Sequence, residues 1–173
     1  MERESEPAAE CEGYEGLDIV FLIKPQRRHD AKKISAILKL YIKREMTREE
    51  LDALSRKIVT ASIEVHRAMG PGLLEKIYEE CLAKELELQS IQARRQVNIP
   101  LNYKGFLLDR NYTIDLLVED EIILELKSTE AVVPVFEAQI ISYLKLADKR
   151  LGFLLNFNVP LMKHGIKRFV NGF

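Results

Sequence analysis

The segment EIILELK, residues 121–127, constrains the fold more than any other part of the sequence. Its apolar residues predict a buried strand, but Glu125 and Lys127 stand two positions apart within it. Because successive side chains on a strand point to opposite faces, both charges lie on the same face. Any fold of this chain must therefore give a carboxylate and an ammonium group a common environment on an otherwise apolar strand.

Size and composition indicate one globular domain with a small appendage. The chain has 173 residues, of which 47% are hydrophobic, so a core can form without disulfides or a structural metal. The formal net charge is −1, which excludes a global basic field and requires any nucleic-acid site to be a local patch. Cys11 and Cys81 form no CxxC pair or Cys/His cluster, which argues against zinc and suits a reducing compartment.

The N-terminal region differs from the remainder. Residues 1–45 predict an extension with an acidic, disordered head, and residues 46–173 predict a single domain. The segment RRHDAKKISAILKLYIKRE predicts an amphipathic helix, and an accessory helix and a nucleic-acid-binding arm both remain open for it. The acidic start lacks the basic region of a signal peptide, and LDIVFLI is too short to cross a bilayer. We therefore expect a cytoplasmic protein without membrane contact.

Two helices are predicted at the start of the domain. Thr47 and Glu50 fit a capping box, and an apolar stripe at helical spacing follows, formed by Leu51, Leu54, Ile58 and Val65. Gly70-Pro71-Gly72 ends this helix. A second helix is predicted over about residues 73–89, with a buried stripe formed by Leu74, Ile77, Cys81 and Leu88.

The rest of the domain alternates between strands and one helix. Val97, Ile99, Leu101 and Tyr103 alternate with polar residues and predict a half-buried strand. FLLDRNYTIDLLV and IILELK predict two more strands, followed by a helix after Pro134, a buried strand at LGFLLNF and a short edge strand near the end. This order predicts an α/β fold with a central sheet flanked by helices.

Asp115 is a second charge in an apolar strand, within YTIDLLV. If residues 119–121 form a three-residue loop, Val118 pairs with Ile122 and Asp115 falls opposite Glu125 on the same face. A two-residue loop without a bulge would instead separate the two carboxylates. A functional site at these residues therefore requires the three-residue loop or an equivalent bulge.

Two facing carboxylates repel each other, and their burial is costly unless a cation lies between them. Mg²⁺ prefers oxygen ligands and usually takes one or two carboxylates. Lys127 beside such an ion could stabilise developing negative charge or orient an attacking water. These residues thus predict a metal-dependent phosphodiester-cleaving centre, although an ion pair on a solvated sheet face remains the alternative.

The pattern of Asp115 followed by Glu125-Leu126-Lys127 resembles the D…(D/E)-x-K signature of the PD-(D/E)XK nuclease superfamily. Ile114 stands where the proline of the name would be. The predicted order of elements is also similar to the αβββαβ core of that superfamily. The resemblance implies a restriction-endonuclease-like fold with a mixed central sheet, and Mg²⁺ or Mn²⁺ as the cofactor.

The segment GLLEKIY, residues 72–78, matches a GxxExxY signature, and its surroundings, IEVHRAMGPGLLEKIYEECL, resemble the GxxExxY protein family, which is grouped with these nucleases. The resemblance runs from about Leu51 to Val170. It implies that Glu75 joins Asp115 and Glu125 around the metal. A first-turn glutamate that favours the positive end of its helix is the alternative, and for Tyr78 a core role is favoured over support of Glu75.

Gln139 and Tyr143 lie four residues apart and share a helix face. The segment QIISY resembles the QxxxY motif of RecB-type nucleases, in which the pair helps to position DNA and the active site. Arg94, Arg95 and the basic C-terminal residues suggest a local phosphate-binding surface, with a solvated basic edge as the alternative. His66 is expected to cap carbonyl groups at a helix end.

Two functions remain open from the sequence. The first is a metal-dependent nuclease that hydrolyses phosphodiester bonds of nucleic acid, with DNA as the expected partner. The second is a non-catalytic module that binds nucleic acid or protein on a nuclease fold. Because small nucleases of this fold often work as dimers, the resemblance also suggests a homodimer.

Overall fold

A computed structural model describes residues 45–172 of the chain. The predicted extension over residues 1–45, with its amphipathic helix, therefore lies outside the described residues apart from Glu45. The described elements are, in chain order, α2 (Arg48–Met69), α3 (Glu75–Leu88), β1 (Ala93–Tyr103), β2 (Phe106–Val118), β3 (Ile122–Lys127), α4 (Pro134–Leu146), β4 (Leu151–Asn156), the 3₁₀ helix η2 (Met162–His164) and β5 (Ile166–Val170).

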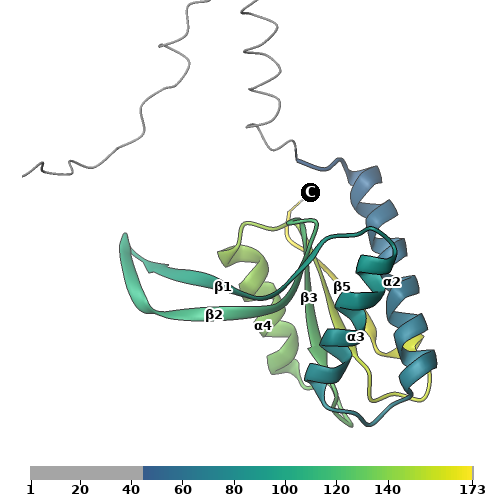
Figure 1. Ribbon diagram of the computed structural model, residues 1–173. Coiled ribbons are helices and arrows are strands. Elements are labelled where there is room, and N and C mark those ends of the chain that lie inside the picture. Colours follow the sequence, from purple (N-terminus) through teal and green to yellow (C-terminus); the bar gives the residue numbers. More distant parts are fainter. Residues whose placement is uncertain (1–44, 173) are drawn as a thin grey trace, which may run out of the picture. The chain divides into compact units, whose positions relative to one another are not determined.

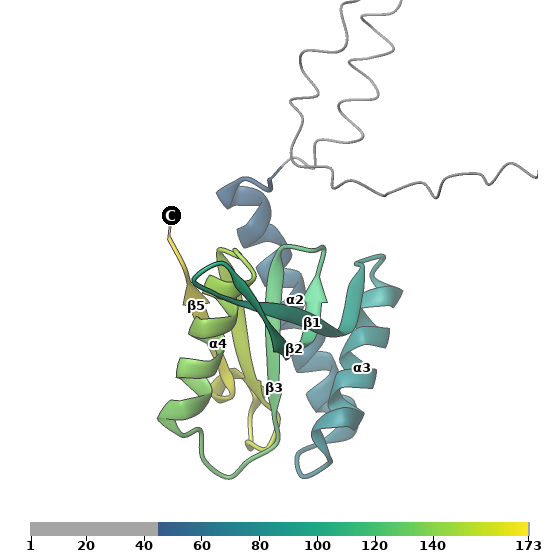
Figure 2. The ribbon, with the colours of Figure 1, turned by 90° about the vertical axis from the view of Figure 1, so that its left-hand side faces the viewer.

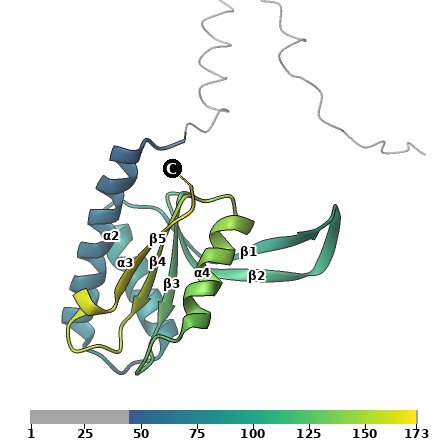
Figure 3. The ribbon, with the colours of Figure 1, turned by 180° about the vertical axis from the view of Figure 1, so that it is seen from behind.

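The strands form one five-stranded sheet in the order β1-β2-β3-β4-β5. β3 and β4 are parallel, and all other neighbours are antiparallel, so the sheet is mixed. The parallel pair needs a crossover connection, which α4 supplies. α2 and α3 lie on one side of the sheet and α4 on the other (Figures 1 and 3). The predicted α/β architecture, with its αβββαβ order and short edge strand, is confirmed. None of the helices between residues 45 and 172 is long and apolar enough to cross a membrane.

The start and end of α2 follow the sequence closely. The Glu50 amide donates to Thr47 Oγ1 at 3.2 Å, and the Thr47 amide donates to Glu50 Oε2 at 2.8 Å, which confirms the capping box. All four predicted stripe residues of α2 are buried. The helix ends at Gly70, whose φ of 69° lies in the left-handed region that glycine adopts without steric cost.

The predicted buried stripe of α3 is wrong. Leu74 and Leu88 are 75% and 71% exposed, and Ile77 is also exposed, whereas Cys81 is half-buried. The buried residues are instead Tyr78, Glu79, Leu82 and Leu86. Tyr78 and Leu82 each lie one residue beyond the predicted Ile77 and Cys81, which corresponds to a rotation of about 100° around the helix axis. Both stripes contain apolar residues, so only packing against the sheet and α2 selects between them.

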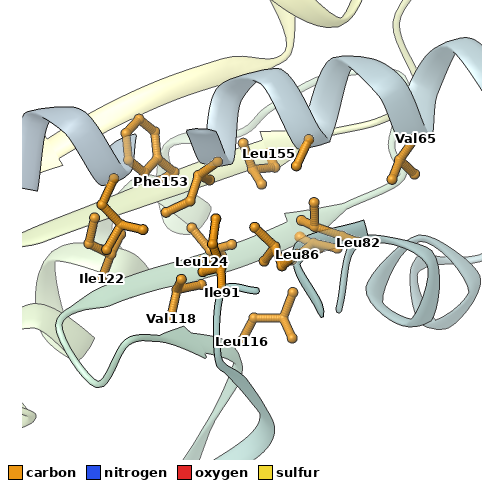
Figure 4. Packing of buried hydrophobic residues seen from close by; sticks show 14 of the residues in the cluster. Val65, Leu82, Leu86, Ile91, Leu116, Val118, Ile122, Leu124, Phe153 and Leu155 are labelled. Carbon is orange, nitrogen blue, oxygen red and sulfur yellow. The ribbon is translucent and has the colours of Figure 1, made fainter. Parts of the chain in front are cut away.

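The core has two parts, one on each face of the sheet. The larger part packs α2 and α3 against β2, β3 and β4, as Figure 4 shows for residues such as Leu82, Leu116 and Leu124. The smaller part packs Tyr143 and Leu144 of α4 against Ile123 and Ile114. Because β3 and β4 are covered on both faces, they read as continuous apolar runs rather than as alternating patterns. This confirms the prediction of a buried strand at LGFLLNF.

The far half of the β1–β2 hairpin extends beyond the core, and we call residues 100–112 the arm. The arm projects sideways from the other strands (Figure 1). In the view turned by 90°, it crosses in front of the sheet (Figure 2). Within it, Phe106, Leu107 and Tyr103 are largely exposed. The body of the hairpin packs on both sides: Leu116 contacts the α2 and α3 layer, while Ile114 contacts α4. Since residues two apart on a regular strand share a face, the strand rotates locally at Asp115.

Candidate active site

The turn between β2 and β3 determines which side chains meet. Val118 pairs with Ile122 and Leu116 with Leu124, so residues 119–121 form the predicted three-residue loop. The Glu121 amide donates to the Val118 carbonyl at 2.9 Å, and Glu119 and Asp120 have positive φ values of 50° and 59°. These pairs confirm the predicted register as far as Leu116 and Leu124, and one further step along it would bring Asp115 opposite Glu125.

Asp115 is held against the main chain of β3. Its Oδ2 atom accepts a hydrogen bond from the Leu126 amide at 2.8 Å. Burial raises the pKa of Asp115, and the Leu126 hydrogen bond and the charge of Lys127 oppose that rise. The main-chain bond fixes the carboxylate beside Glu125, because Leu126 is the next residue of the strand.

Glu125 is the most deeply buried acid of the site, with 2% of its surface exposed. Its Oε1 atom accepts from Lys127 Nζ at 2.7 Å, whereas its Oε2 atom is buried without a hydrogen-bond partner. Burial, reinforced by the charge of Asp115, raises the pKa of Glu125 to about 7. A buried carboxylate oxygen that lacks a partner is costly, and either a proton or a cation would remove that cost.

Lys127 lies between Glu125 of its own strand and Glu75 of α3. Its Nζ atom is 2.7 Å from Glu125 Oε1 and 4.0 Å from Glu75 Oε2, and it lies 5.1 Å from the centre of the Phe136 ring. Burial alone would lower the pKa of Lys127, but the hydrogen bond and charge of Glu125, with the charges of Glu75 and Asp115, raise it above its ordinary value. The side chain is therefore a firmly held ammonium group.

Glu75 approaches the site from the first position of α3. The sequence places it in a first helical turn, and the structure agrees. Its side chain is about half exposed and reaches Lys127. The start of α3 is tied to the end of β3, because Ser128 Oγ donates to the Leu73 carbonyl at 2.6 Å. The elements that carry Glu75 and Lys127 are thus joined directly.

Gln139 and Tyr143 meet on α4. Gln139 Nε2 donates to the Tyr143 hydroxyl oxygen at 2.7 Å, and Tyr143 is almost fully buried. Burial raises the pKa of Tyr143, the Gln139 bond opposes the rise, and the charges of Glu125 and Asp115 add to it. The Tyr112 ring of the arm lies 5.3 Å from the Tyr143 ring. The pair therefore forms one side of the site, where α4 meets the arm.

The acids fit a divalent cation in their chemistry, but they do not form a ready-made cage. In the part of the chain that the structure describes, no group of three or more His, Cys, Asp or Glu side chains is arranged to hold a metal. What supports a cation is the unpartnered Oε2 of Glu125 beside Asp115, because carboxylate oxygens are the ligands that Mg²⁺ prefers. The three-acid ligand set of Glu75, Asp115 and Glu125 stays a prediction.

Sequence-based interpretations of two other residues can be compared with the structure. Tyr78 is fully buried, and its hydroxyl donates to the Gly70 carbonyl at 2.6 Å, so it fills the core as favoured. His66 Nε2 lies 2.8 Å from a carbonyl, but that carbonyl belongs to Val159 in the loop after β4 rather than to its own helix. His66 thus ties a distant loop to α2.

Part of the predicted basic surface is paired with acids. Arg94 pairs with Asp120, and Arg95 pairs with Glu79 and Glu80. In the C-terminal part, Lys167 pairs with Glu137 and Arg168 with Asp52. The side chains of these four basic residues are therefore engaged within the domain, which argues against a continuous phosphate-binding patch built from them.

Sequence reasoning missed two residues beside Asp115. Gln96 Nε2 donates to Glu79 Oε2 at 2.7 Å, and the Gln96 side chain lowers the pKa of Asp115. In the sequence, Gln96 reads as an ordinary polar position of an alternating strand, and Glu79 reads as a polar helix residue. Neither carries a signal at the sequence level, because the burial of Glu79 and its bond to Gln96 depend on the packing of α3 against β1.

Comparison with known proteins gives one match. The family model described as PD-(D/E)XK nuclease superfamily matches residues 52–169, which is most of the chain. No curated protein and no solved structure matches. The matched region contains Glu75, Asp115, Glu125, Lys127 and the α4 pair, and its mixed sheet flanked by helices is consistent with a restriction-endonuclease-like fold. The narrower GxxExxY family name is not confirmed. The chain belongs to the PD-(D/E)XK nuclease superfamily.

Proposed function

We propose that this protein is a metal-dependent nuclease that hydrolyses phosphodiester bonds of nucleic acid, with DNA as substrate and Mg²⁺ or Mn²⁺ as cofactor. The observation that carries the proposal is the buried, unpartnered Glu125 Oε2, which lies beside Asp115 and next to the Lys127 ammonium group. Membership of a nuclease superfamily supports it, since these nucleases generally use divalent metals.

Asp115 and Glu125 would hold the metal, with Glu75 completing the set directly or through water. A bound divalent ion would lower the pKa of a water molecule and neutralise charge on the phosphate. Glu125 can use its free Oε2 for the ion while its Oε1 keeps the bond to Lys127. The cation at Asp115 and Glu125 thus need not displace the lysine.

Lys127 would orient the attacking water or stabilise the negative charge that develops on the phosphate. Its raised pKa keeps it protonated at neutral pH, which fits a donor and electrostatic role rather than that of a base. Tyr143 is also held protonated by its raised pKa, so Gln139 and Tyr143 provide hydrogen-bond donors that can orient the nucleic-acid strand.

The decisive test combines binding and cleavage. Calorimetry should show Mn²⁺ binding that Asp115→Ala removes. Labelled single- and double-stranded DNA should be cleaved in Mn²⁺ but not in EDTA, and Lys127→Ala should abolish cleavage while leaving Mn²⁺ binding. Undiminished binding in the Asp115 variant would defeat the assignment of the metal ligands.

One observation favours a second function, a non-catalytic module that binds nucleic acid or protein. The arm exposes Tyr103, Phe106 and Leu107, which are costly to leave in water unless a partner covers them. Binding of DNA or RNA without cleavage under any metal condition would favour this second function. The homodimer and the cytoplasmic location stay predictions.

A further inference from the structure

Gln96 stands directly opposite Asp115 where the arm leaves the sheet. The ladder pairs Arg95 with Leu116 and Val97 with Ile114, so Gln96 and Asp115 face each other between these pairs. Gln96 has a φ of 50°, which places a residue other than glycine in the left-handed region. Such a conformation is unfavourable and persists only where the surroundings enforce it, and it concentrates at functional sites.

The Gln96 amide lies between two acids. Its Nε2 atom donates to Glu79 Oε2 at 2.7 Å, and its side chain, across the ladder from Asp115, favours the ionised form and so lowers the pKa of Asp115. A glutamine NH₂ group carries two hydrogens, so the one that Glu79 does not use is available to Asp115.

Glu79 is itself held in place. It is buried in α3, and its Oε1 atom accepts from Arg95 Nε at 2.7 Å. Arg95 compensates the charge of Glu79, so this buried acid can orient the Gln96 amide without needing a metal of its own. A chain of contacts therefore runs from Arg95 through Glu79 and Gln96 to Asp115.

Asp115 consequently has a polar neighbour on each side. The Leu126 amide of β3 holds Oδ2, and Gln96 of β1 approaches from the neighbouring strand. We propose that Gln96 is a positioning residue, whose amide, oriented by Glu79 and Arg95, holds the Asp115 carboxylate in the orientation that binds a divalent cation together with Glu125. This inference rests on the proposed function, in which Asp115 is a metal ligand.

A residue needed only to form the bend in the backbone at position 96, where φ is 50°, would behave differently from a positioning residue. Glycine adopts positive φ without cost, so Gln96→Gly relieves the backbone while removing the amide. If Gln96 only formed the bend, glycine would serve at least as well in every measurement. A positioning role requires the metal affinity of the folded protein to fall in the glycine variant as well.

The experiment measures Mn²⁺ affinity by calorimetry and the free energy of unfolding by denaturation, both on the full chain. Gln96→Gly and Gln96→Ala should weaken Mn²⁺ binding to the same extent, by about tenfold or more, as is usual when a group that orients a metal ligand is removed. Ser90→Gly is the matched control, because Ser90 also has a positive φ, of 57°, but lies away from the acids. It should leave the affinity unchanged. Both Gln96 variants lose the donor to buried Glu79 Oε2, so the denaturation curves serve to show that they are still folded under the conditions of the titration.

The outcomes separate this inference from the proposed function. If the unmodified protein binds no Mn²⁺, the proposed function and this inference fail together. If it binds Mn²⁺ and Gln96→Gly binds equally well, only the positioning role is overturned. Equal weakening by Ser90→Gly would also overturn it, because the effect would then follow from backbone change in general.

Discussion

Strand β2 passes through two regions with different surroundings. From Phe106 to Tyr112 it belongs to the arm and is exposed on both faces, whereas from Ile114 to Val118 it is covered by helices on both sides of the sheet, with Asp115 between them only partly buried. The candidate active site lies at the boundary, where Asp115 faces Gln96 and contacts β3. The comparison shows that a carboxylate site can form where β2 separates from β3. Beyond the last paired residues, main-chain donors of β3 such as the Leu126 amide are available to a side chain.

The largest expected effect is a difference in the free energy of unfolding between substitutions in the two regions of β2. Leu116→Ala removes a fully buried side chain and should lower the free energy of unfolding by about 2–5 kcal/mol, through lost burial and a residual cavity. Leu107→Ala, the same substitution in the arm, should change it by less than about 0.5 kcal/mol. Urea denaturation of both variants measures the difference. If both substitutions lowered the free energy of unfolding by a similar amount, Leu107 would have to be buried in solution by contacts of the arm.

The next effect is a difference in kcat between variants of Lys127, in the candidate active site, and of Lys104, in the arm. Lys127→Ala should lower kcat for DNA cleavage by about 100-fold or more, because it removes a held positive charge next to the reacting phosphate. Lys104→Ala, at the tip of the arm, should leave kcat unchanged, since Lys104 is exposed and its Nζ atom lies over the ring of Tyr103. Single-turnover cleavage assays give both values. A loss of kcat in the Lys104 variant would show that the arm takes part in the chemical step.

The smallest effect concerns pH and the burial of Glu125. Its pKa is about 7 in the folded chain and close to 4.5 when unfolded, so the folded state binds more protons between these values. Stability of the metal-free protein should therefore fall as the pH rises from about 4.5 to about 7, by roughly 1–3 kcal/mol. Glu125→Gln should remove this part of the slope.

Denaturation in EDTA at several pH values checks this expectation. Glu130→Gln is the control, because Glu130 is an exposed acid five residues along the chain, and it should keep the slope of the unmodified protein. An unchanged slope in Glu125→Gln would indicate that Glu125 is not buried as an unpartnered acid.

The sequence predicted the hairpin register because the answer depended on local residues. A three-residue loop at residues 119–121 is enough to pair Val118 with Ile122 and Leu116 with Leu124, the pairs next to Asp115 and Glu125. The capping box at Thr47 and the apolar runs of β3 and β4 are equally local, and they were predicted for the same reason.

The stripe of α3 could not be chosen from the sequence. Ile77 and Leu88 would have been as suitable for a core as Leu82 and Leu86, and only the neighbours of the helix decide which set is covered. The ion pairs of the basic residues also could not be predicted, because Arg168 pairs with Asp52 and Lys167 with Glu137 across large sequence separations.

The sequence by itself determined the order of elements, the pairing of β2 with β3 and the presence of Asp115, Glu125 and Lys127 on one local surface. These features depend on periodicity, caps and turn length, all of which act over a few residues. Tertiary structure alone decided that Glu125 Oε2 is left without a partner, and that Gln96 turns toward Asp115 with Glu79 and Arg95 behind it. Burial and hydrogen-bond partners are properties of segments brought together from distant positions, so no local pattern can encode them.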